Sequence, residues 1–369
     1  MAEMKNFTTL ELAKELALAF GPSGCEEDIA KIIIEYLTPY ADEISRDGMG
    51  SVIAVYKKRA ASDEYDPNRE PDTPSRTPDV TRLMLSAPMD EPGFMIKSID
   101  SDGYLKIAPL CGRDPKILTA RNVTVGDEDR KTIGYVGVKP THLGGSGDFD
   151  SLYVDIGAKD KDDALAHVEI GDFGAYRSDF VRFGKDDSLI KCKALDSRLG
   201  CAVLCSTLKH LSESGDVLPF DVYFAFTCRD EITRSSAGGA ARRINPDVAI
   251  LVRGESVNDT AGDTYTASAK LGGGATVSLM DRGTLYDREL YTSILDIAKT
   301  ESIPAQVKQY VSDATGSAQI NRALEGVRCA EISIPIRYSR TAACVASVHD
   351  LEATEKLTLA VIREWAKSC

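Results

Sequence analysis

The second half of the chain alternates between strand patterns and helix patterns, and this alternation limits the fold more than any other feature of the sequence. Runs rich in β-branched and aromatic residues predict strands, and apolar residues at helical spacing between them predict helices. Strands that alternate with helices form a largely parallel sheet that the helices cover on both faces. We therefore predict an α/β domain. Its expected strands are 221–227, 248–252, 305–311 and 329–335, and its expected helices are 199–212, 288–301, 317–324 and 350–367.

The N-terminal part of the chain fits the same domain. Residues 23–26 (SGCE) form a capping-box pattern before apolar residues at helical spacing, which predicts a helix over 29–37 with Ser23 as its cap. Residues 59–81 are polar and rich in proline, without periodicity, and are expected to form a flexible surface loop. The expected strands on either side of this loop are 51–55 and 83–86.

The middle of the chain has a different character. Short strand patterns follow one another there without helices between them, separated by Asp-Gly and Gly-Asp turns. These strands are expected at 103–107, 122–125, 132–138 and 152–156. We therefore predict a small β-rich domain over 93–188, inserted into an α/β domain that consists of 1–92 and 189–369.

Charge and cysteine content exclude several classes of protein. The 369 residues carry a net charge of −13, so we expect neither nucleic acid nor a membrane surface as a partner. No apolar run approaches the roughly 20 residues that a membrane helix needs, and no secretory signal is recognised. Nine cysteines without a C-x-x-C pair are typical of reduced thiols. A cytoplasmic protein is expected.

Acidic side chains follow several predicted strands. Asp90 and Glu91 come after strand 83–86, and Asp230 and Glu231 come after strand 221–227. In a doubly wound domain the functional residues gather at the carboxyl ends of the strands. Carboxylates from several strand ends can converge on divalent metal ions. The alternative is that they are solvated acids at the starts of loops.

Ten short blocks resemble the family 42 metallopeptidases, the glutamyl and tetrahedral aminopeptidases. They stand in the family's order and spacing: GPSGCEE (21–27), MDEPGFM (89–95), KPTHL (139–143), VDIGA (154–158), KALDSR (193–198), DVYFAFT (221–227), NPDVAI (245–250), KLGGGA (270–275), MDRG (280–283) and IPIRY (334–338). The resemblance implies an α/β catalytic domain of the dinuclear-zinc aminopeptidase type, with a central mixed sheet flanked by helices and an inserted β-rich lid. It implies release of N-terminal residues from peptides by water that two divalent cations, zinc or cobalt, activate. It also implies dimers that build twelve-subunit shells, with contacts from the lid.

The resemblance further implies five side chains that hold the two cations, and three of the five are replaced here. Asp196 and Glu231 occupy retained ligand positions. Pro88, Arg253 and Arg340 stand where a histidine, an aspartate and a second histidine are expected. None of the four histidines of the chain is placed to replace a lost ligand.

Other positions of the site also depart from the family pattern. Asp230 stands at the general-base position, where the family has glutamate. Asp90, which would orient the first histidine, is retained but has no histidine to orient. A Thr-Asp-Ala-Gly element that lines the site in the family is replaced by TGSA at 315–318.

These replacements predict a catalytically silent or very weak family member that binds no cofactor tightly. Arginine pairs with carboxylates and stays charged, so Arg253 and Arg340 are expected to form ion pairs with the acids of the site. The alternative is that both arginines point to solvent and the site has decayed.

Three other functions remain open. An active aminopeptidase or hydrolase could use an altered, single-metal site. A binding module could use the arginine-rich cleft to capture an anion, such as the carboxylate of a peptide. A cysteine nucleophile at Cys228 would lack a histidine base. Peptides and further copies of the chain, in a dimer or a dodecamer, are the expected partners.

Overall fold

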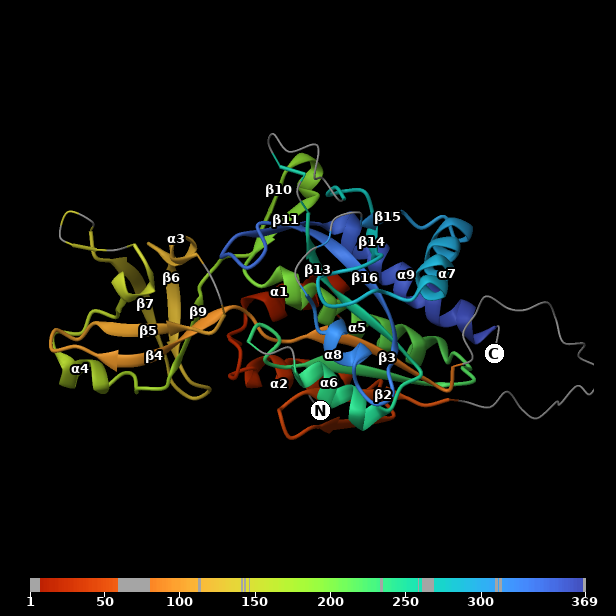
Figure 1. Cartoon of the computed structure of the whole chain (residues 1–369), viewed down its shortest axis with the longest axis horizontal. Coiled ribbons are helices and arrows are strands. Elements are labelled where there is room, and N and C mark those ends of the chain that lie inside the picture. Colours follow the sequence, from red (N-terminus) through yellow and green to blue (C-terminus); the bar gives the residue numbers. More distant parts are fainter. Residues whose placement is uncertain are drawn as a thin grey trace, which may run out of the picture.

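The computed structural model describes residues 7–58, 80–111, 114–140, 142, 144–145, 147–232, 235–257, 259–260, 269–308, 311 and 314–367. Most of the expected surface loop, residues 59–79, lies outside the described residues. Figure 1 shows a β-barrel on the left and a larger body of sheet and helices on the right. No helix in the described part of the chain is long and apolar enough to cross a membrane.

The larger body is built on an 11-stranded mixed sheet with the order β1-β2-β12-β3-β13-β16-β17-β11-β10, in which β14 also pairs with β16 and β15 pairs with β14. The four central strands are parallel: β12 (Asp221–Thr227), β3 (Arg82–Pro88), β13 (Val248–Ser256) and β16 (Arg328–Arg337). The flanking strands are β1 (Glu43–Arg46), β2 (Val52–Tyr56), β10 (Val181–Phe183), β11 (Leu189–Cys192), β14 (Ala275–Ser278), β15 (Ala305–Lys308) and β17 (Cys344–Ser347). The predicted α/β fold is confirmed.

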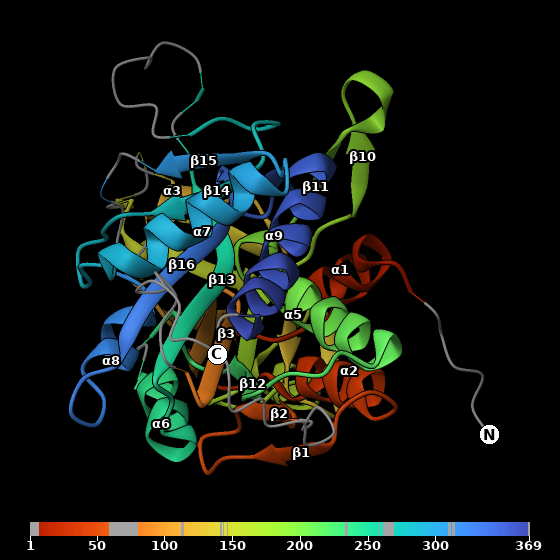
Figure 2. The same ribbon diagram turned by 90° about the vertical axis from the view of Figure 1, so that its right-hand side faces the viewer.

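Helices cover both faces of this sheet because its central strands are apolar on both faces. On β3, Leu83 and Leu85 pack in the core beneath α5, whereas Met84 packs in the core beneath α6. Figure 2 shows α5 and α9 on one side of the strands and α6 and α8 on the other. The helices are α1 (Thr9–Leu18), α2 (Glu27–Leu37), α5 (Leu195–Ser214), α6 (Ser235–Ile244), α7 (Arg288–Thr300), α8 (Ser317–Asn321) and α9 (Val348–Ala366).

The smaller body is a closed barrel with the strand order β4-β5-β8-β7-β6-β9 and its own apolar core. Its strands are β4 (Gly93–Ile99), β5 (Leu105–Pro109), β6 (Asn122–Gly126), β7 (Lys131–Val138), β8 (Leu152–Asp155) and β9 (Phe173–Tyr176), with the short helices α3 (Pro115–Leu118) and α4 (Lys161–Leu165). β10 lies within the range 93–188 expected for the inserted domain, but it pairs with β11 and extends the large sheet.

Three differences from the sequence-based predictions affect the residues of the site. Helix α5 begins at Leu195 rather than at 199, so Asp196 lies in its first turn. Strand β13 continues to Ser256, so Arg253 lies within the strand and not after it. The predicted capping box is wrong, because α2 begins after Glu26 without a side-chain cap and the Ser23 hydroxyl bonds elsewhere.

Two glycines let α5 lie directly against β13. A Cβ atom at Gly200 would stand 2.2 Å from the carbonyl oxygen of Val252, and one at Gly254 would stand 2.7 Å from the Cα atom of Asp196. Contacts this short exclude any side chain at either position. The two glycines therefore bring the first turn of α5 next to the strand that carries Arg253.

We expect Gly200→Ala to lower the free energy of unfolding by roughly 1–3 kcal/mol, because the added methyl group must push α5 away from β13. Gly239→Ala is the matched control: it lies inside α6, where a Cβ would meet only the Met49 sulfur at 3.9 Å. Replacing glycine by alanine inside a helix should stabilise by about 0.5–1 kcal/mol. Urea denaturation of both variants measures the difference, and equal effects would contradict the close approach.

Candidate functional site

The ends of β3 and β12 lie side by side and place the first acidic residues of the site. Pro88 is the register partner of Thr227, and the amide of Met89 donates to the carbonyl of Thr227 at 2.6 Å. The chain then turns at Met89–Glu91 on one strand and at 228–231 on the other. Pro88 itself is buried at the strand end and has no N–H to donate.

Asp90 holds these two turns together. Its carboxylate is fully buried and accepts the hydroxyl of Ser23 and, at 2.9 Å, the main-chain N–H of Glu231. Asp90 therefore joins the two strand ends and orients no histidine in the described part of the chain. Its Oδ1 atom has no hydrogen-bond partner among the described residues. Burial, and then the nearby carboxylates of Asp230, Glu26 and Glu231, raise the pKa of Asp90 well above its usual range.

Arg340 joins the two retained ligand positions. Its main-chain N–H donates to Asp196 Oδ2 at 2.7 Å, and its guanidinium Nε lies 3.2 Å from Glu231 Oε2. The residue has a φ of 61°, in the left-handed region that non-glycine residues rarely adopt. The negative charge of Glu231 raises the pKa of Arg340, so the guanidinium stays charged.

Arg253 approaches the same group of acids from β13. Its side chain is buried, and its Nη1 lies 4.0 Å from Asp230 Oδ2, at the long end of the ion-pair range. Burial alone would lower the pKa of Arg253, but the surrounding carboxylates, Glu255 and Asp230 first, raise it overall. Both predicted arginine–carboxylate contacts are thus present, and neither arginine points away from the acids.

Asp196 lies at the centre of these contacts and is almost completely buried. Burial raises its pKa, the carboxylate of Glu231 adds to this, and Arg253 and Arg340 oppose it. Its Oδ1 atom accepts no hydrogen bond within the described part of the chain. Carboxylates this close stay ionised only when positive charge compensates them, and here two guanidinium groups supply it.

The described residues do not fit a dinuclear metal centre. Among them, no three histidine, cysteine or acidic side chains are arranged so that they could hold a metal ion. His142, His167 and His349 are exposed, and His210 lies 3.4 Å from Glu355 on α9. The arginines add positive charge where a cation would bind, so the donor set favours internal ion pairs over a metal.

A second buried polar group adjoins Arg253, and the sequence analysis missed it. Glu331 on β16 is fully buried and accepts the hydroxyl of Tyr286. Glu255 pairs with the buried Lys308 at 3.2 Å. The sequence signal for this group is a single glutamate or lysine inside a strand pattern, as in CAEISIPI and AQVK. Lone polar residues in such patterns are read as edge or surface positions, and only the tertiary fold brings them together.

We expect Glu331→Gln to reduce the loss of stability that accompanies rising pH. Burial raises the pKa of Glu331 from 4.5 to about 7, so the fold favours the neutral acid. The stabilisation that Glu331 contributes is fully present below its pKa in the unfolded chain, 4.5, and is lost as the pH rises through its folded pKa of about 7. At about 1.4 kcal/mol per pKa unit, the difference between wild type and variant should reach roughly 3 kcal/mol. Urea denaturation of wild type and variant at about pH 5 and pH 8 measures this difference. Glu325→Gln, at an exposed position, is the control. An equal loss of stability between the two pH values in wild type and Glu331→Gln would contradict the prediction.

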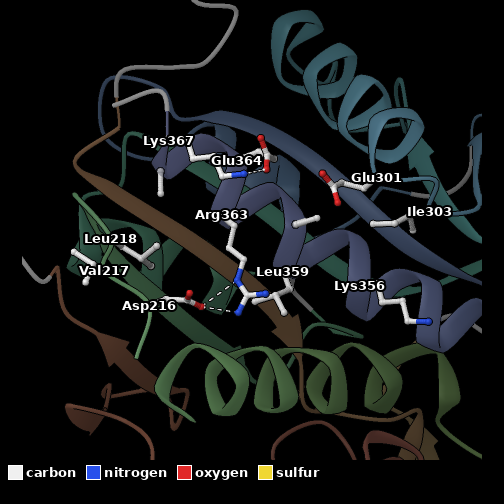
Figure 3. A pocket seen from close by; sticks show the side chains of 12 residues that line it. Asp216, Val217, Leu218, Glu301, Ile303, Lys356, Leu359, Arg363, Glu364 and Lys367 are labelled. Carbon is white, nitrogen blue, oxygen red and sulfur yellow. Dashed lines mark hydrogen bonds and ion pairs between the residues drawn. The ribbon is translucent and has the colours of Figure 1, made fainter. Parts of the chain in front are cut away.

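The large cavity in Figure 3 lies elsewhere on the molecule. It has a volume of 610 Å³ and is lined by α9 and by the segments before β12 and β15, including Leu218, Ile303 and Leu359. An ion pair between Arg363 and Asp216, 2.8 Å long, lies in it. None of the candidate site residues lines this cavity.

Cys228 is not an exposed nucleophile. It is fully buried, and its thiol donates to the carbonyl of Met49 at 3.0 Å. Burial raises the pKa of the thiol, which disfavours the reactive thiolate.

Comparison with known proteins agrees with the fold and the sequence blocks. A family model described as M42 glutamyl aminopeptidase matches residues 73–357. A putative aminopeptidase of Acetivibrio thermocellus is 30% identical over 97% of this chain and 100% of its own length, and the lysyl aminopeptidase of Pyrococcus furiosus is 30% identical over 96% of each chain.

Solved structures show the same relationship. The TET aminopeptidase from the marine sediment archaeon Thaumarchaeota archaeon SCGC AB-539-E09 has a TM-score of 0.87 at 27% identity, over 98% of this chain and 99% of its own. The TET1 peptidase of Pyrococcus horikoshii, described as assembling into a tetrahedron or a large octahedral shell, has a TM-score of 0.81 at 25% identity, over 96% of this chain and 99% of its own. The predicted resemblance is confirmed, and the chain belongs to the M42 glutamyl aminopeptidase family of metallopeptidases.

Proposed function

We propose that this chain is a family member in which arginine side chains have taken the place of the catalytic cations, so that it has negligible aminopeptidase activity. The observation that carries the proposal is the position of Arg340, which contacts Asp196 with its main chain and Glu231 with its guanidinium. Asp196 and Glu231 are the two retained ligand positions, and Arg340 already engages both.

Charge compensation by arginine differs from charge compensation by a metal in its chemistry. A guanidinium neutralises carboxylates through bidentate hydrogen bonds, but it offers no vacant coordination position and does not generate hydroxide at neutral pH. Asp230, at the general-base position, faces Arg253 and is one methylene shorter than the glutamate of the family. The arrangement therefore holds the acids in place without activating a nucleophile.

The test is to measure metal content and peptidase activity on the same sample. The purified chain is incubated with zinc, cobalt or manganese, dialysed, and analysed for bound metal beside hydrolysis of aminoacyl-nitroanilides. We expect far less than one metal ion per chain and no turnover above the buffer rate. Near-stoichiometric metal with steady turnover would contradict the proposal and favour an active hydrolase with an altered metal site.

We further propose that the chain keeps the assembly role of its relatives in the cytoplasm, as at least a dimer and in the largest form a dodecamer. Residues 93–188 would act as the lid that contributes contacts, inserted into the domain formed by 1–92 and 189–369. The support is that lid blocks KPTHL and VDIGA persist although metal ligands do not, and that a related TET1 peptidase is described as a dodecamer. Light scattering that gives a monomer mass at micromolar concentration would contradict this.

A further inference from the structure

A small polar cavity lies at the seam between the barrel and the α/β body. Its volume is 260 Å³, and its lining includes Arg121, Arg177, Ser178, Asp179 and Lys191. In Figure 1 the seam lies where β6 and β9 of the barrel come towards β11 of the large sheet. No candidate residue of the carboxylate site lines this cavity.

The end of the barrel places Arg121 and Arg177 on two adjacent chain segments that both line the cavity. Strands β6 and β9 are antiparallel with Val123 opposite Tyr176, and the amide of Arg177 donates to the carbonyl of Asn122 at 2.9 Å. The pairing therefore runs one residue past β9, with Arg177 opposite Asn122, the first residue of β6, and Arg121 directly before it. Two guanidinium groups thus come from neighbouring chain segments that hydrogen bonds hold in register.

Lys191 reaches the same place from the large sheet. Its Nζ donates to the Ser178 hydroxyl at 3.3 Å and to the carbonyl of Asp179 at 3.1 Å, so one of its three N–H groups remains available. The Ser178 hydroxyl donates in turn to the carbonyl of Ala342 at 2.7 Å. Side chains from both bodies and the loop before β17 therefore meet at this cavity.

The cavity has an excess of positive charge. The side chain of Arg121 donates one hydrogen bond, from Nε to the carbonyl of Ile117 at 3.2 Å, and neither Arg121 nor Arg177 forms an ion pair with any residue that the structure describes. Three cations face one acid, Asp179, in a chain whose net charge is −13. A local excess of about two positive charges attracts anions, and a phosphate monoester carries about two negative charges at neutral pH.

We propose that this cavity binds a phosphate group, either as the free ion or as part of a phosphorylated small molecule or peptide. The planar guanidinium groups of Arg121 and Arg177 can each present two parallel N–H donors to phosphate oxygens, and Lys191 adds a point charge. The volume of 260 Å³ leaves room for the phosphate and a short attached group. This site does not depend on the state of Asp196 or Glu231, so it stands whether or not the chain binds metal.

The test is isothermal titration calorimetry of the full chain at low ionic strength and without phosphate buffer, because surface charges are screened by salt. Three probes are titrated: inorganic phosphate, a phosphoserine peptide, and succinate as a dicarboxylate of similar charge. We expect phosphate or the phosphopeptide to bind and succinate to bind at least tenfold more weakly. Which of the first two binds more tightly distinguishes the free ion from the phosphorylated molecule.

Variants connect binding to the cavity. The double variant Arg121→Gln/Arg177→Gln should weaken phosphate binding by tenfold or more, since each charge-assisted hydrogen bond contributes about a tenfold factor or more. Arg177→Lys, which keeps the charge and loses the fork of donors, should lie between the double variant and wild type. The exposed Arg288→Gln, on α7, is the matched control and should bind as wild type does. The proposal would be overturned if wild type bound neither phosphate nor the phosphopeptide, if the double variant bound the better of the two as tightly as wild type does, or if succinate bound more tightly than both.

Discussion

The triple variant Pro88→His, Arg253→Asp and Arg340→His is expected to bind divalent metal ions that the wild-type chain does not retain. Two unit charges about 4 Å apart at an effective dielectric near 20 interact by roughly 4 kcal/mol, and a divalent ion doubles that figure. Removing two guanidinium groups therefore removes repulsion worth several powers of ten in affinity. The substitutions also add two imidazoles and one carboxylate beside Asp196 and Glu231.

Metal content after dialysis measures this result. The matched control is Arg288→Asp/Arg322→His, which makes the same change of net charge at two exposed arginines and should leave metal content at the wild-type level. Peptidase activity should return only in part, because Asp230 and Gly316 also differ from the family pattern. A triple variant with the circular dichroism spectrum of wild type and no added metal would show that the arginines are not what excludes the cations.

The substitution Lys193→Met is expected to lower the free energy of unfolding, and this is the second large effect that we predict. Lys193 is buried, and its Nζ lies 2.5 Å from Glu91 Oε1 and 2.7 Å from the carbonyl of Ala19. Removing it leaves the carboxylate of the fully buried Glu91 with two other contacts among the described residues, the Gly21 amide at 3.1 Å and Arg198 Nη2 at 3.5 Å. Removing one partner of a buried ion pair costs about 3–5 kcal/mol, and because Arg198 still compensates the charge of Glu91 we expect a loss near the lower end of this range.

Denaturation of two further variants separates the ion pair from other causes. Lys97→Met removes the same side chain from an exposed pair with Asp150, and exposed pairs contribute about 1 kcal/mol or less. The double variant Glu91→Gln/Lys193→Met should lose further stability, since it leaves the buried guanidinium of Arg198 without its carboxylate partner. A cost of Lys193→Met no greater than that of Lys97→Met would refute this interpretation.

The sheet and its helices were predictable because burial on both faces leaves a clear trace in the sequence. DVYFAFT and PDVAILV are nearly continuous apolar runs, as expected for central parallel strands. The ends of elements were less predictable. β13 includes Arg253, because the strand stays paired with β16 as far as Ser256 although its composition becomes polar at that point.

Long-range hydrogen bonds explain most of what the sequence analysis missed at the site. Ser23 fits a helix cap locally, but Asp90 competes for its hydroxyl from a different part of the chain. The role of Asp90 depends on the main-chain N–H of Glu231, a group that every residue type has. The arginines at the replaced ligand positions could be identified from the sequence, because the blocks that resemble the family adjoin them, but their contacts required the fold.

The barrel also determines the order in which the chain can acquire structure. Both neighbours of β3 in the sheet, β12 and β13, follow the barrel in the sequence. The barrel strands, in contrast, pair among residues 93–176 and need nothing from the rest of the chain for their ladders. Local contacts form faster than distant ones, and domains fold as units during synthesis. On the ribosome, β3 therefore waits without its partners while the barrel closes, and the large sheet assembles only after β12 and β13 emerge.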